Sequence, residues 1–243
     1  MATPRYDARE VVRYERQEFL EEVWDYHKGE HVTILGATRN GKTHLAYQLL
    51  DETARPDLQA IVIVMKPRDA TVARFSKEAD FKIIRDWPPS KITVLSKKPR
   101  GYTLWPKETG NPEYDDWKHA DIFQRAIRDS YQKGNRIVFA DEGYSLENEY
   151  GLTKDLNRTW TKGGSMESGL WVASQRPAFI SRWAYQAQHL FLSNDPDKDT
   201  QKRYGEIGAG VDPDLVRELT AKLKMYEWVY INRDHRTLCI VNK

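Results

Sequence analysis

Residues 36–43 read Gly36-Ala37-Thr38-Arg39-Asn40-Gly41-Lys42-Thr43, which fits the pattern G-x-x-x-x-G-K-[ST]. The β-branched run at 31–35 predicts a strand just before this segment, and residues 44–53 predict a helix after it. In a loop between a strand and a helix, successive backbone N–H groups surround phosphate oxygens, and the helix N-terminus adds its positive dipole end. The segment therefore predicts a phosphate-binding loop. A glycine turn with an exposed lysine is the alternative.

The residues of this phosphate-binding loop have separate expected tasks. The Lys42 ammonium can reach the β- and γ-phosphates of a nucleotide, and the Thr43 hydroxyl can ligate Mg²⁺. The expected nucleotide-binding residues are Gly36, Ala37, Thr38, Arg39, Asn40, Gly41, Lys42, Thr43 and His44.

Two acids follow a second apolar run, Ile137-Val138-Phe139-Ala140-Asp141-Glu142. Carboxylates at the C-terminal edge of a parallel sheet face the crevice where such sheets bind ligands. Asp141 is expected to hold Mg²⁺, whereas Glu142, displaced from the metal, would orient and deprotonate an attacking water. This pair favours hydrolysis of the nucleotide. The alternative is two solvated acids at a strand end.

The rest of the chain alternates strand and helix patterns. Further strands are expected at 60–65, 136–140, 170–174 and 188–192, with a short strand candidate at 92–95 and an apolar stretch around 81–84. Helices are expected at 6–27, 117–133 and 213–224. The pattern predicts a single α/β domain over 1–243, with a mostly parallel central sheet between helices. We expect an N-terminal helical extension at 1–28 and a C-terminal β-hairpin at 226–241.

The segment 96–116 contains several prolines and glycines and predicts an exposed, irregular loop. Tyr102 and Trp105 lie among its basic residues. These basic residues are the local candidates for contact with a DNA backbone, namely Lys97, Lys98, Arg100 and Lys107. Lys66-Pro67-Arg68 is a further candidate, and an ordinary solvated loop is the alternative.

The composition narrows the class of protein. The 243 residues include 38 Lys plus Arg and 36 Asp plus Glu, so the net charge of +2 excludes a bulk polycation and makes any nucleic-acid contact local. The single cysteine, Cys239, cannot form an internal disulfide. No apolar run approaches the roughly 20 residues of a membrane span, and residues 1–20 lack the apolar core of a secretory signal, so we expect a cytoplasmic protein.

A third motif is Gly169-Leu170-Trp171-Val172-Ala173-Ser174-Gln175-Arg176-Pro177, a strand pattern that ends in an amide side chain. Gln175 in this position can lie between the γ-phosphate and the attacking water. The Ser-Gln-Arg-Pro ending resembles the sensor segment of the HerA/FtsK superfamily of P-loop ATPases, ring-forming DNA translocases whose relatives package viral genomes. The order of phosphate-binding loop, Asp-Glu strand and Gln-Arg-Pro strand is also similar, and it covers about residues 32–192.

The resemblance implies a RecA-like (ASCE) P-loop NTPase fold, in the branch that inserts a strand between the phosphate-loop and acid-bearing strands. It implies ATP and Mg²⁺ as cofactors, with Glu142 as the catalytic base and Gln175 as the sensor. In these rings an arginine of the neighbouring subunit completes the site, often within a Gly-Arg pair, but Lys162-Gly163-Gly164 stands here without one. Arg158 is the first candidate for that catalytic role, with Arg176 and Arg182 as alternatives.

Arg39, inside the phosphate-binding loop, is similar to an arginine that viral packaging ATPases often carry there. The Arg39 side chain would contact either the γ-phosphate or a neighbouring subunit, and the sequence does not distinguish the two.

The resemblance predicts an ATP-hydrolysing double-stranded DNA translocase, most specifically a viral genome-packaging ATPase. It would work in the host cytoplasm as a homo-oligomeric ring, a pentamer or hexamer, with a portal or capsid partner and no membrane. One alternative is a Zot-like assembly or secretion ATPase, which would favour a membrane segment. Another is a monomeric P-loop NTPase or kinase, which explains the loop but not Glu142 or the Gln175 strand. Stimulation of hydrolysis by DNA separates the motor from both.

Overall fold

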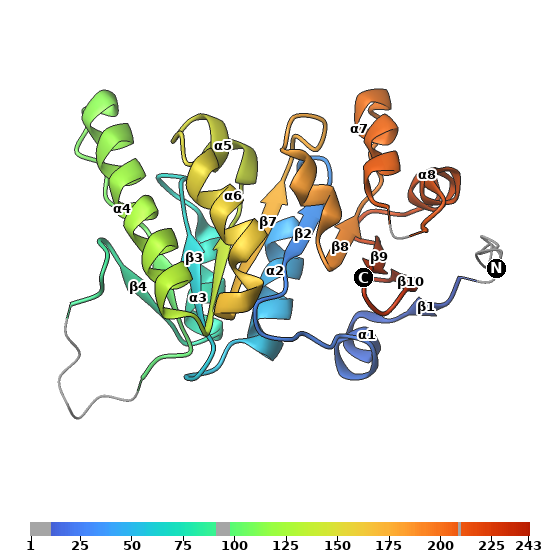
Figure 1. The fold of residues 1–243 in the computed structure, drawn as a ribbon, viewed down its shortest axis with the longest axis horizontal. Coiled ribbons are helices and arrows are strands. Elements are labelled where there is room, and N and C mark those ends of the chain that lie inside the picture. The colour runs from blue at the N-terminus through green and yellow to red at the C-terminus, as the bar shows by residue number, and fades with distance from the viewer. Residues whose placement is uncertain (1–10, 91–97, 209) are drawn as a thin grey trace. The chain divides into compact units, whose positions relative to one another are not determined.

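The structure, a computed structural model, describes residues 11–90, 98–208 and 210–243 (Figure 1). They form two compact units. Unit 1 contains the described part of Met1–Asp25 together with His31–Lys42 and Ser174–Lys243, and unit 2 contains Tyr26–Glu30 and Thr43–Ala173. Helix α2 (Lys42–Thr53) and strand β7 (Ser168–Ser174) each have one terminal residue in unit 1 and the rest in unit 2.

Unit 2 is built on five parallel strands in the order β7-β6-β3-β5-β4. Besides β7 they are β3 (Gln59–Ile63), β4 (Phe81–Ile84), β5 (Gly101–Leu104) and β6 (Arg136–Ala140). Every residue of β3 is buried, as expected for a parallel strand that is covered on both faces. The strands predicted at 60–65, 136–140 and 170–174 are confirmed, and the apolar stretch around 81–84 forms β4.

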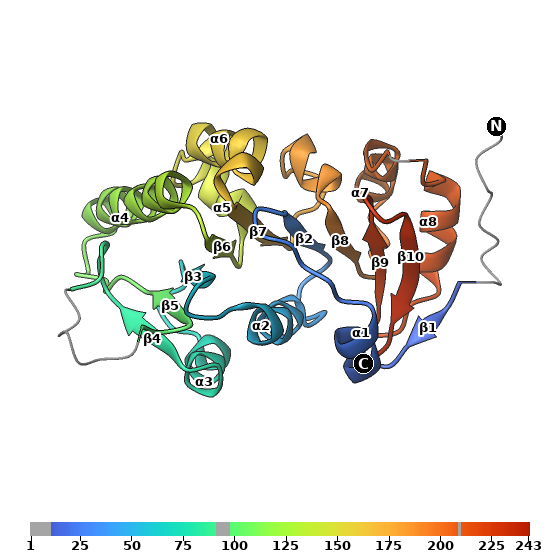
Figure 2. The same cartoon turned by 60° about the horizontal axis from the view of Figure 1, so that its bottom comes forward.

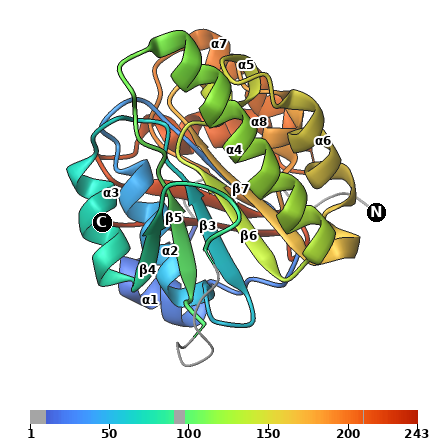
Figure 3. The same cartoon turned by 90° about the vertical axis from the view of Figure 1, so that its left-hand side faces the viewer.

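Helices cover both faces of this sheet. Figure 2 shows α2 and α3 (Ala70–Glu78) on one face and α4 (Pro112–Lys133), α5 (Gly143–Asn148) and α6 (Thr153–Lys162) on the other, and Figure 3 gives the side view. The ends of α4 follow local rules, because Asn111 caps its first turn, Pro112 occupies the first helical position and Gly134, at φ 65°, ends it. A short 3₁₀ helix, Gly164–Met166, precedes β7.

Unit 1 contains the strand before the phosphate-binding loop, β2 (Val32–Leu35), which pairs in parallel with β8 (His189–Leu192). Strands β9 (Trp228–Asn232) and β10 (Thr237–Val241) then continue antiparallel, which confirms the predicted C-terminal hairpin. Its helices are α1 (Arg16–Glu22), α7 (Lys198–Lys202) and α8 (Pro213–Ala221), with 3₁₀ turns at Arg182–Gln186 and Arg203–Glu206. Phe19 of α1 packs edge-on against Phe191 of β8 and Tyr230 of β9.

The predicted helix at 6–27 is wrong over most of the described residues. Arg13 and Tyr14 form a short strand, β1, that pairs in parallel with Ile240 and Val241 of β10. Helix α1 starts only at Arg16, after a capping box in which the side chains and backbone amides of Glu15 and Glu18 bond reciprocally. Residues 1–10, which the prediction also covered, lie outside the described part of the chain.

The predicted exposed loop at 96–116 is also wrong, because it contains β5, a buried strand between β3 and β4. Tyr102 is 5% exposed and Thr103 is fully buried. Gly101 is required for this packing, since a Cβ there would lie 2.9 Å from the Ala60 carbonyl oxygen and 3.0 Å from the Phe81 ring. The strand candidate at 92–95 and the candidate DNA-contact residue Lys97 lie outside the described residues.

Over the described ranges 11–90, 98–208 and 210–243, none of the helices combines the length and the apolar character needed to cross a membrane.

Candidate nucleotide-binding site

The phosphate-binding loop follows β2 directly and leads into α2, the context that the sequence predicts. Gly36 is buried, and a Cβ at this position would lie 2.0 Å from the Ser193 hydroxyl oxygen. Arg39 at φ 68° and Gly41 at φ 84° both adopt the left-handed conformation that turns the chain around the loop. A side chain at Gly41 would also meet the Tyr226 ring at 2.8 Å.

Side-chain bonds fix the loop to the two residues that follow strand β8. Asn40 donates from Nδ2 to the Ser193 hydroxyl at 2.9 Å and to the Asn194 carbonyl at 3.2 Å. The middle of the loop is therefore held by the residues that follow β8, and the polar middle position of the motif has a structural role of its own.

Lys42 begins α2 and its ammonium folds back over the loop. Its Nζ donates to the carbonyl oxygens of Gly36 and Ala37, each at 2.8 Å. These contacts place a positive charge over the backbone of the loop, where an anion bound to the loop N–H groups would meet it.

The end of β7 reaches the same loop within unit 1. The backbone N–H of Gly36 donates to the Ser174 carbonyl at 3.2 Å, and the exposed Thr38 hydroxyl donates to Oε1 of Gln175 at 3.1 Å. The structure thus brings the predicted sensor amide to the phosphate-binding loop. Arg176, Ala178 and Phe179 follow, and with Ala37 and Thr38 they line a cavity of about 320 Å³.

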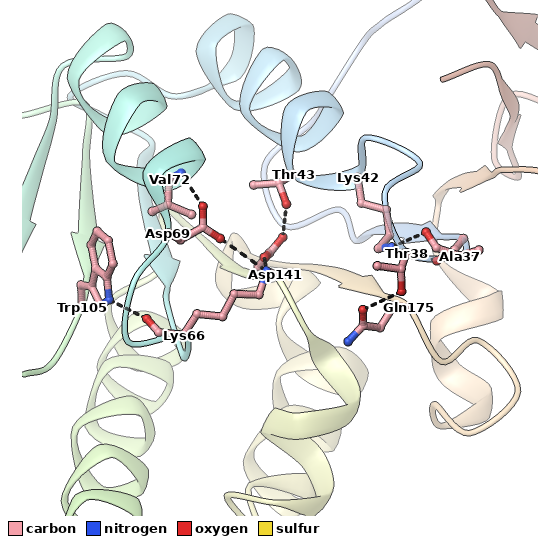
Figure 4. A network of polar contacts seen from close by, with 11 residues as sticks. Ala37, Thr38, Lys42, Thr43, Lys66, Asp69, Val72, Trp105, Asp141 and Gln175 are labelled. Atoms are coloured by element: carbon pink, nitrogen blue, oxygen red, sulfur yellow. Dashed lines mark hydrogen bonds and ion pairs between the residues drawn. The ribbon is translucent and has the colours of Figure 1, made fainter. Parts of the chain in front are cut away.

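In unit 2, the first turn of α2 meets the carboxyl end of β6. The Thr43 hydroxyl donates to Oδ1 of Asp141 at 2.7 Å, a bond that Figure 4 marks with a dashed line. The Asp141 side chain is 10% exposed. A hydroxyl and a carboxylate are the hard oxygen donors that Mg²⁺ takes in phosphate sites, so the two predicted metal-binding residues fit that ion. Glu142 caps α5, where its carboxylate accepts the Tyr144 N–H at 3.3 Å.

Lys66 also lies at this site, whereas the sequence suggests it only as a candidate for contact with DNA. Its Nζ lies 3.1 Å from Oδ2 of Asp141 and 3.4 Å from Oδ2 of Asp69. Partial burial alone would lower the pKa of Lys66, but the carboxylates of Asp141 and then Asp69 outweigh it and hold the pKa above its ordinary value. The strand order could have predicted this contact. Lys66 follows β3 and Asp141 follows β6, and these two strands are parallel neighbours whose carboxyl ends meet at one edge of the sheet.

Arg158, the first candidate for an arginine acting between subunits, lies on α6. Its Nη1 is 3.5 Å from Oδ1 of the buried Asp155. Arg128 of α4 holds the same carboxylate at 2.9 and 3.1 Å, and Gln124 adds a bond of 2.9 Å. Arg158 is thus the weaker of two arginines on Asp155. The alternatives, Arg176 and Arg182, are exposed residues of unit 1.

The candidate DNA-contact residues do not form one loop. Strand β5 separates Lys98 and Arg100, which precede it, from Lys107, which follows it, by roughly 13 Å of extended chain. Arg100 is engaged internally, with bonds of 2.9 Å to Oδ1 of Asp51 and to the Ala54 carbonyl. Lys98 and Lys107 are exposed.

The strand, phosphate-binding loop and helix, together with an aspartate at the carboxyl end of a parallel strand, define a P-loop NTPase fold of the RecA-like type. No model of a known protein family matches the sequence, and no curated protein matches it. Solved structures with the same fold include the genome packaging NTPase B204 of Sulfolobus turreted icosahedral virus 2, in complex with AMP. The TM-score is 0.61 at 15% identity, covering 88% of this chain and 98% of that one.

Two further solved structures are similar to this chain. The DNA-packaging ATPase B204 of Sulfolobus turreted icosahedral virus gives a TM-score of 0.56 at 15% identity, over 88% of this chain and 98% of that one. VirB4 of Thermoanaerobacter pseudethanolicus gives 0.60 at 10% identity, over 88% and 89% of the two chains. At 10–15% sequence identity, these similarities establish the fold of the chain.

Proposed function

We propose that the chain is an ATPase that hydrolyses ATP to move double-stranded DNA, and that it serves as a viral genome-packaging motor. The observation that carries the hydrolytic part is the 2.7 Å bond between Thr43 of the phosphate-binding loop and Asp141 after β6. It joins the two residues that would hold Mg²⁺, and Glu142 follows directly in the chain.

The proposed site takes one nucleotide. Lys42 and Thr43 fill the last two positions of the phosphate-loop pattern, where the lysine contacts the β- and γ-phosphates and the hydroxyl ligates the Mg²⁺ bound to them. The loop N–H groups and Lys42 would bind the phosphates, and Thr43 and Asp141 would hold Mg²⁺. When bound, the ion neutralises charge that develops on the phosphate oxygens.

Two side chains would act on the attacking water. Glu142 would accept its proton as general base, and the Gln175 amide, bonded to Thr38 at 3.1 Å, would report on the γ-phosphate. Hydrolysis across subunits in a ring requires one more positive group, for which Arg158 is proposed first.

The proposal that the cargo is DNA is supported by similarity to B204, whose two viral forms are described as a genome packaging NTPase and a DNA-packaging ATPase. VirB4 is similar to the same degree, so the fold alone does not choose between a packaging motor and an assembly ATPase. The two functions are distinguished by whether DNA stimulates ATP hydrolysis.

The deciding experiment measures steady-state ATP hydrolysis by the purified chain with and without long double-stranded DNA, at low and at moderate salt. A packaging motor should show stimulation that weakens as salt rises, because contacts with DNA phosphates release counterions. Lys42→Ala is the control, since without the ammonium neither basal nor stimulated hydrolysis should remain. Hydrolysis that is indifferent to every nucleic acid would favour the assembly ATPase.

A further inference from the structure

Lys66 occupies one side of the carboxylate that is proposed to hold the metal. Oδ1 of Asp141 accepts the Thr43 hydroxyl, whereas Oδ2 faces the Lys66 ammonium at 3.1 Å (Figure 4). Both oxygens of Asp141 therefore have a partner from this chain. Because an ammonium and a divalent cation repel each other, a metal that takes Asp141 has to compete with Lys66.

The position of Lys66 allows that competition. Its side chain is 57% exposed, whereas those of Asp141 and Asp69 are only 10% and 13% exposed. Because the Lys66 side chain is half-exposed, water can solvate its ammonium when it leaves Asp141, and the arriving metal replaces its positive charge beside the buried carboxylate.

A second carboxylate, that of Asp69, lies close enough to pair with the displaced ammonium. Oδ2 of Asp69 lies 3.4 Å from the same Nζ, while Oδ1 of Asp69 accepts the Val72 N–H at 3.0 Å and so caps α3. The Lys66 backbone is fixed, because Nε1 of Trp105 donates to its carbonyl at 2.8 Å. The side chain can thus exchange partners while the main chain stays in place.

We propose that Lys66 is a positioning residue that competes with the metal for the Asp141 carboxylate. Its ammonium pairs with Asp141 when no metal is bound, and it moves to Asp69 when a divalent metal binds together with a nucleotide. Metal binding without nucleotide is then disfavoured, because two protein oxygens alone must displace the ammonium, whereas nucleotide phosphates supply further ligands to the metal. This inference rests on the proposed function of the site and adds a determinant of its metal affinity.

The test measures metal binding directly, by electron paramagnetic resonance of free Mn²⁺, with and without ADP. Lys66→Met removes the charge and keeps most of the stem. We expect it to tighten Mn²⁺ binding about two- to five-fold without ADP, and less with ADP. Lys66→Arg should behave like the wild type. Lys77→Met is the matched control, because it removes an exposed lysine near the other end of α3 and should change nothing.

A second variant keeps the inference testable if Lys66→Met does not fold. Asp69→Asn retains a carbonyl oxygen for the Val72 N–H but removes the alternative partner of Lys66, so Mn²⁺ binding should weaken with ADP present. The effect should shrink in the double variant with Lys66→Met, because the two substitutions share one interaction.

The outcomes separate this inference from the proposed function. Unchanged Mn²⁺ affinity in Lys66→Met, in a protein that still binds ADP, would overturn the competing role alone. Weaker Mn²⁺ binding in Lys66→Met with ADP present would overturn it too, and would make Lys66 a phosphate ligand. A wild-type chain that binds neither ADP nor Mn²⁺ would overturn the proposed nucleotide site itself.

Discussion

The Thr43 hydroxyl donates a 2.7 Å hydrogen bond to Oδ1 of Asp141, although the two residues are 98 positions apart in the chain. Thr43 lies in the first turn of α2, and Asp141 follows β6. The helix that follows the phosphate-binding loop and the acid-bearing strand are therefore joined by the two groups that would share a metal ion.

Removing the Thr43 hydroxyl should separate metal-dependent catalysis from folding. Thr43→Val keeps the shape of the side chain, and we expect Mg²⁺-dependent ATP hydrolysis to fall about 100-fold, because an oxygen ligand is lost. The free energy of unfolding should fall by about 1.5–3 kcal/mol for the lost bond to the Asp141 carboxylate. Hydrolysis assays and urea unfolding measure the two effects. Thr43→Ser should restore both, and full activity in Thr43→Val would remove Thr43 from the metal site.

Glu142→Gln should keep nucleotide binding and lose turnover. The glutamine carbonyl can still accept the Tyr144 N–H and cap α5, so the local fold is retained, but the side chain can no longer take a proton. We expect the turnover rate to fall by about 10²–10⁴. Calorimetry with ATP and a steady-state assay test this, with Glu149→Gln, an exposed acid just beyond α5, as the control. Normal turnover in Glu142→Gln would exclude Glu142 as the base.

Arg158→Ala and Arg128→Ala form a matched pair. Both remove an arginine from Asp155, but only Arg128 makes two close bonds to it, so Arg128→Ala should destabilise the fold more. Arg158→Ala should cost less than about 1 kcal/mol of stability. If Arg158 acts between subunits, mixing Arg158→Ala with the wild type should reduce ATPase activity below the level expected from dilution. A linear decline with the fraction of variant would make Arg158 structural.

The stability of the fold should fall in alkali. Burial raises the pKa of the Cys239 thiol from 9.0 to about 12, and burial raises the pKa of the Tyr204 phenol from 10.0 to about 12. Because each folded pKa lies above its unfolded value, the protonated forms contribute full stability below about pH 9. That stability is lost as the pH rises toward about 12, by up to about 1.4 kcal/mol per pH unit for each group. Urea midpoints between about pH 8 and about pH 11 measure this loss, and a constant midpoint would contradict it.

The sequence predicts the central strands well because each is a continuous apolar run that is buried on both faces. The strand 136–140 is observed with the same bounds, and the position of Thr43 and Asp141 follows from motif spacing and parallel topology. The N-terminal helix was predicted too long because Val11 and Val12 fit a helical period. A period does not reveal that Arg13 and Tyr14 pair with β10, which lies at the far end of the chain.

Strand β5 shows a different limit. Gly101-Tyr102-Thr103-Leu104 is short and lies among prolines and glycines, so turn signals dominate its neighbourhood, and only pairing with β3 and β4 makes it a strand. Helix α5 was missed because its six residues are too few to show a period. The contact of Lys66 with Asp141 depends on the order of strands β3 and β6, which no local pattern contains.

The most direct measurement of the central claim is displacement of a third strand from linear double-stranded DNA. A motor that moves along the duplex strips a bound triplex-forming oligonucleotide only while it hydrolyses ATP. We expect the wild type, as purified chain, to release the oligonucleotide with ATP and not with a non-hydrolysable analogue, and Glu142→Gln to release none. ATP hydrolysis that is stimulated by DNA but never displaces the third strand would contradict translocation.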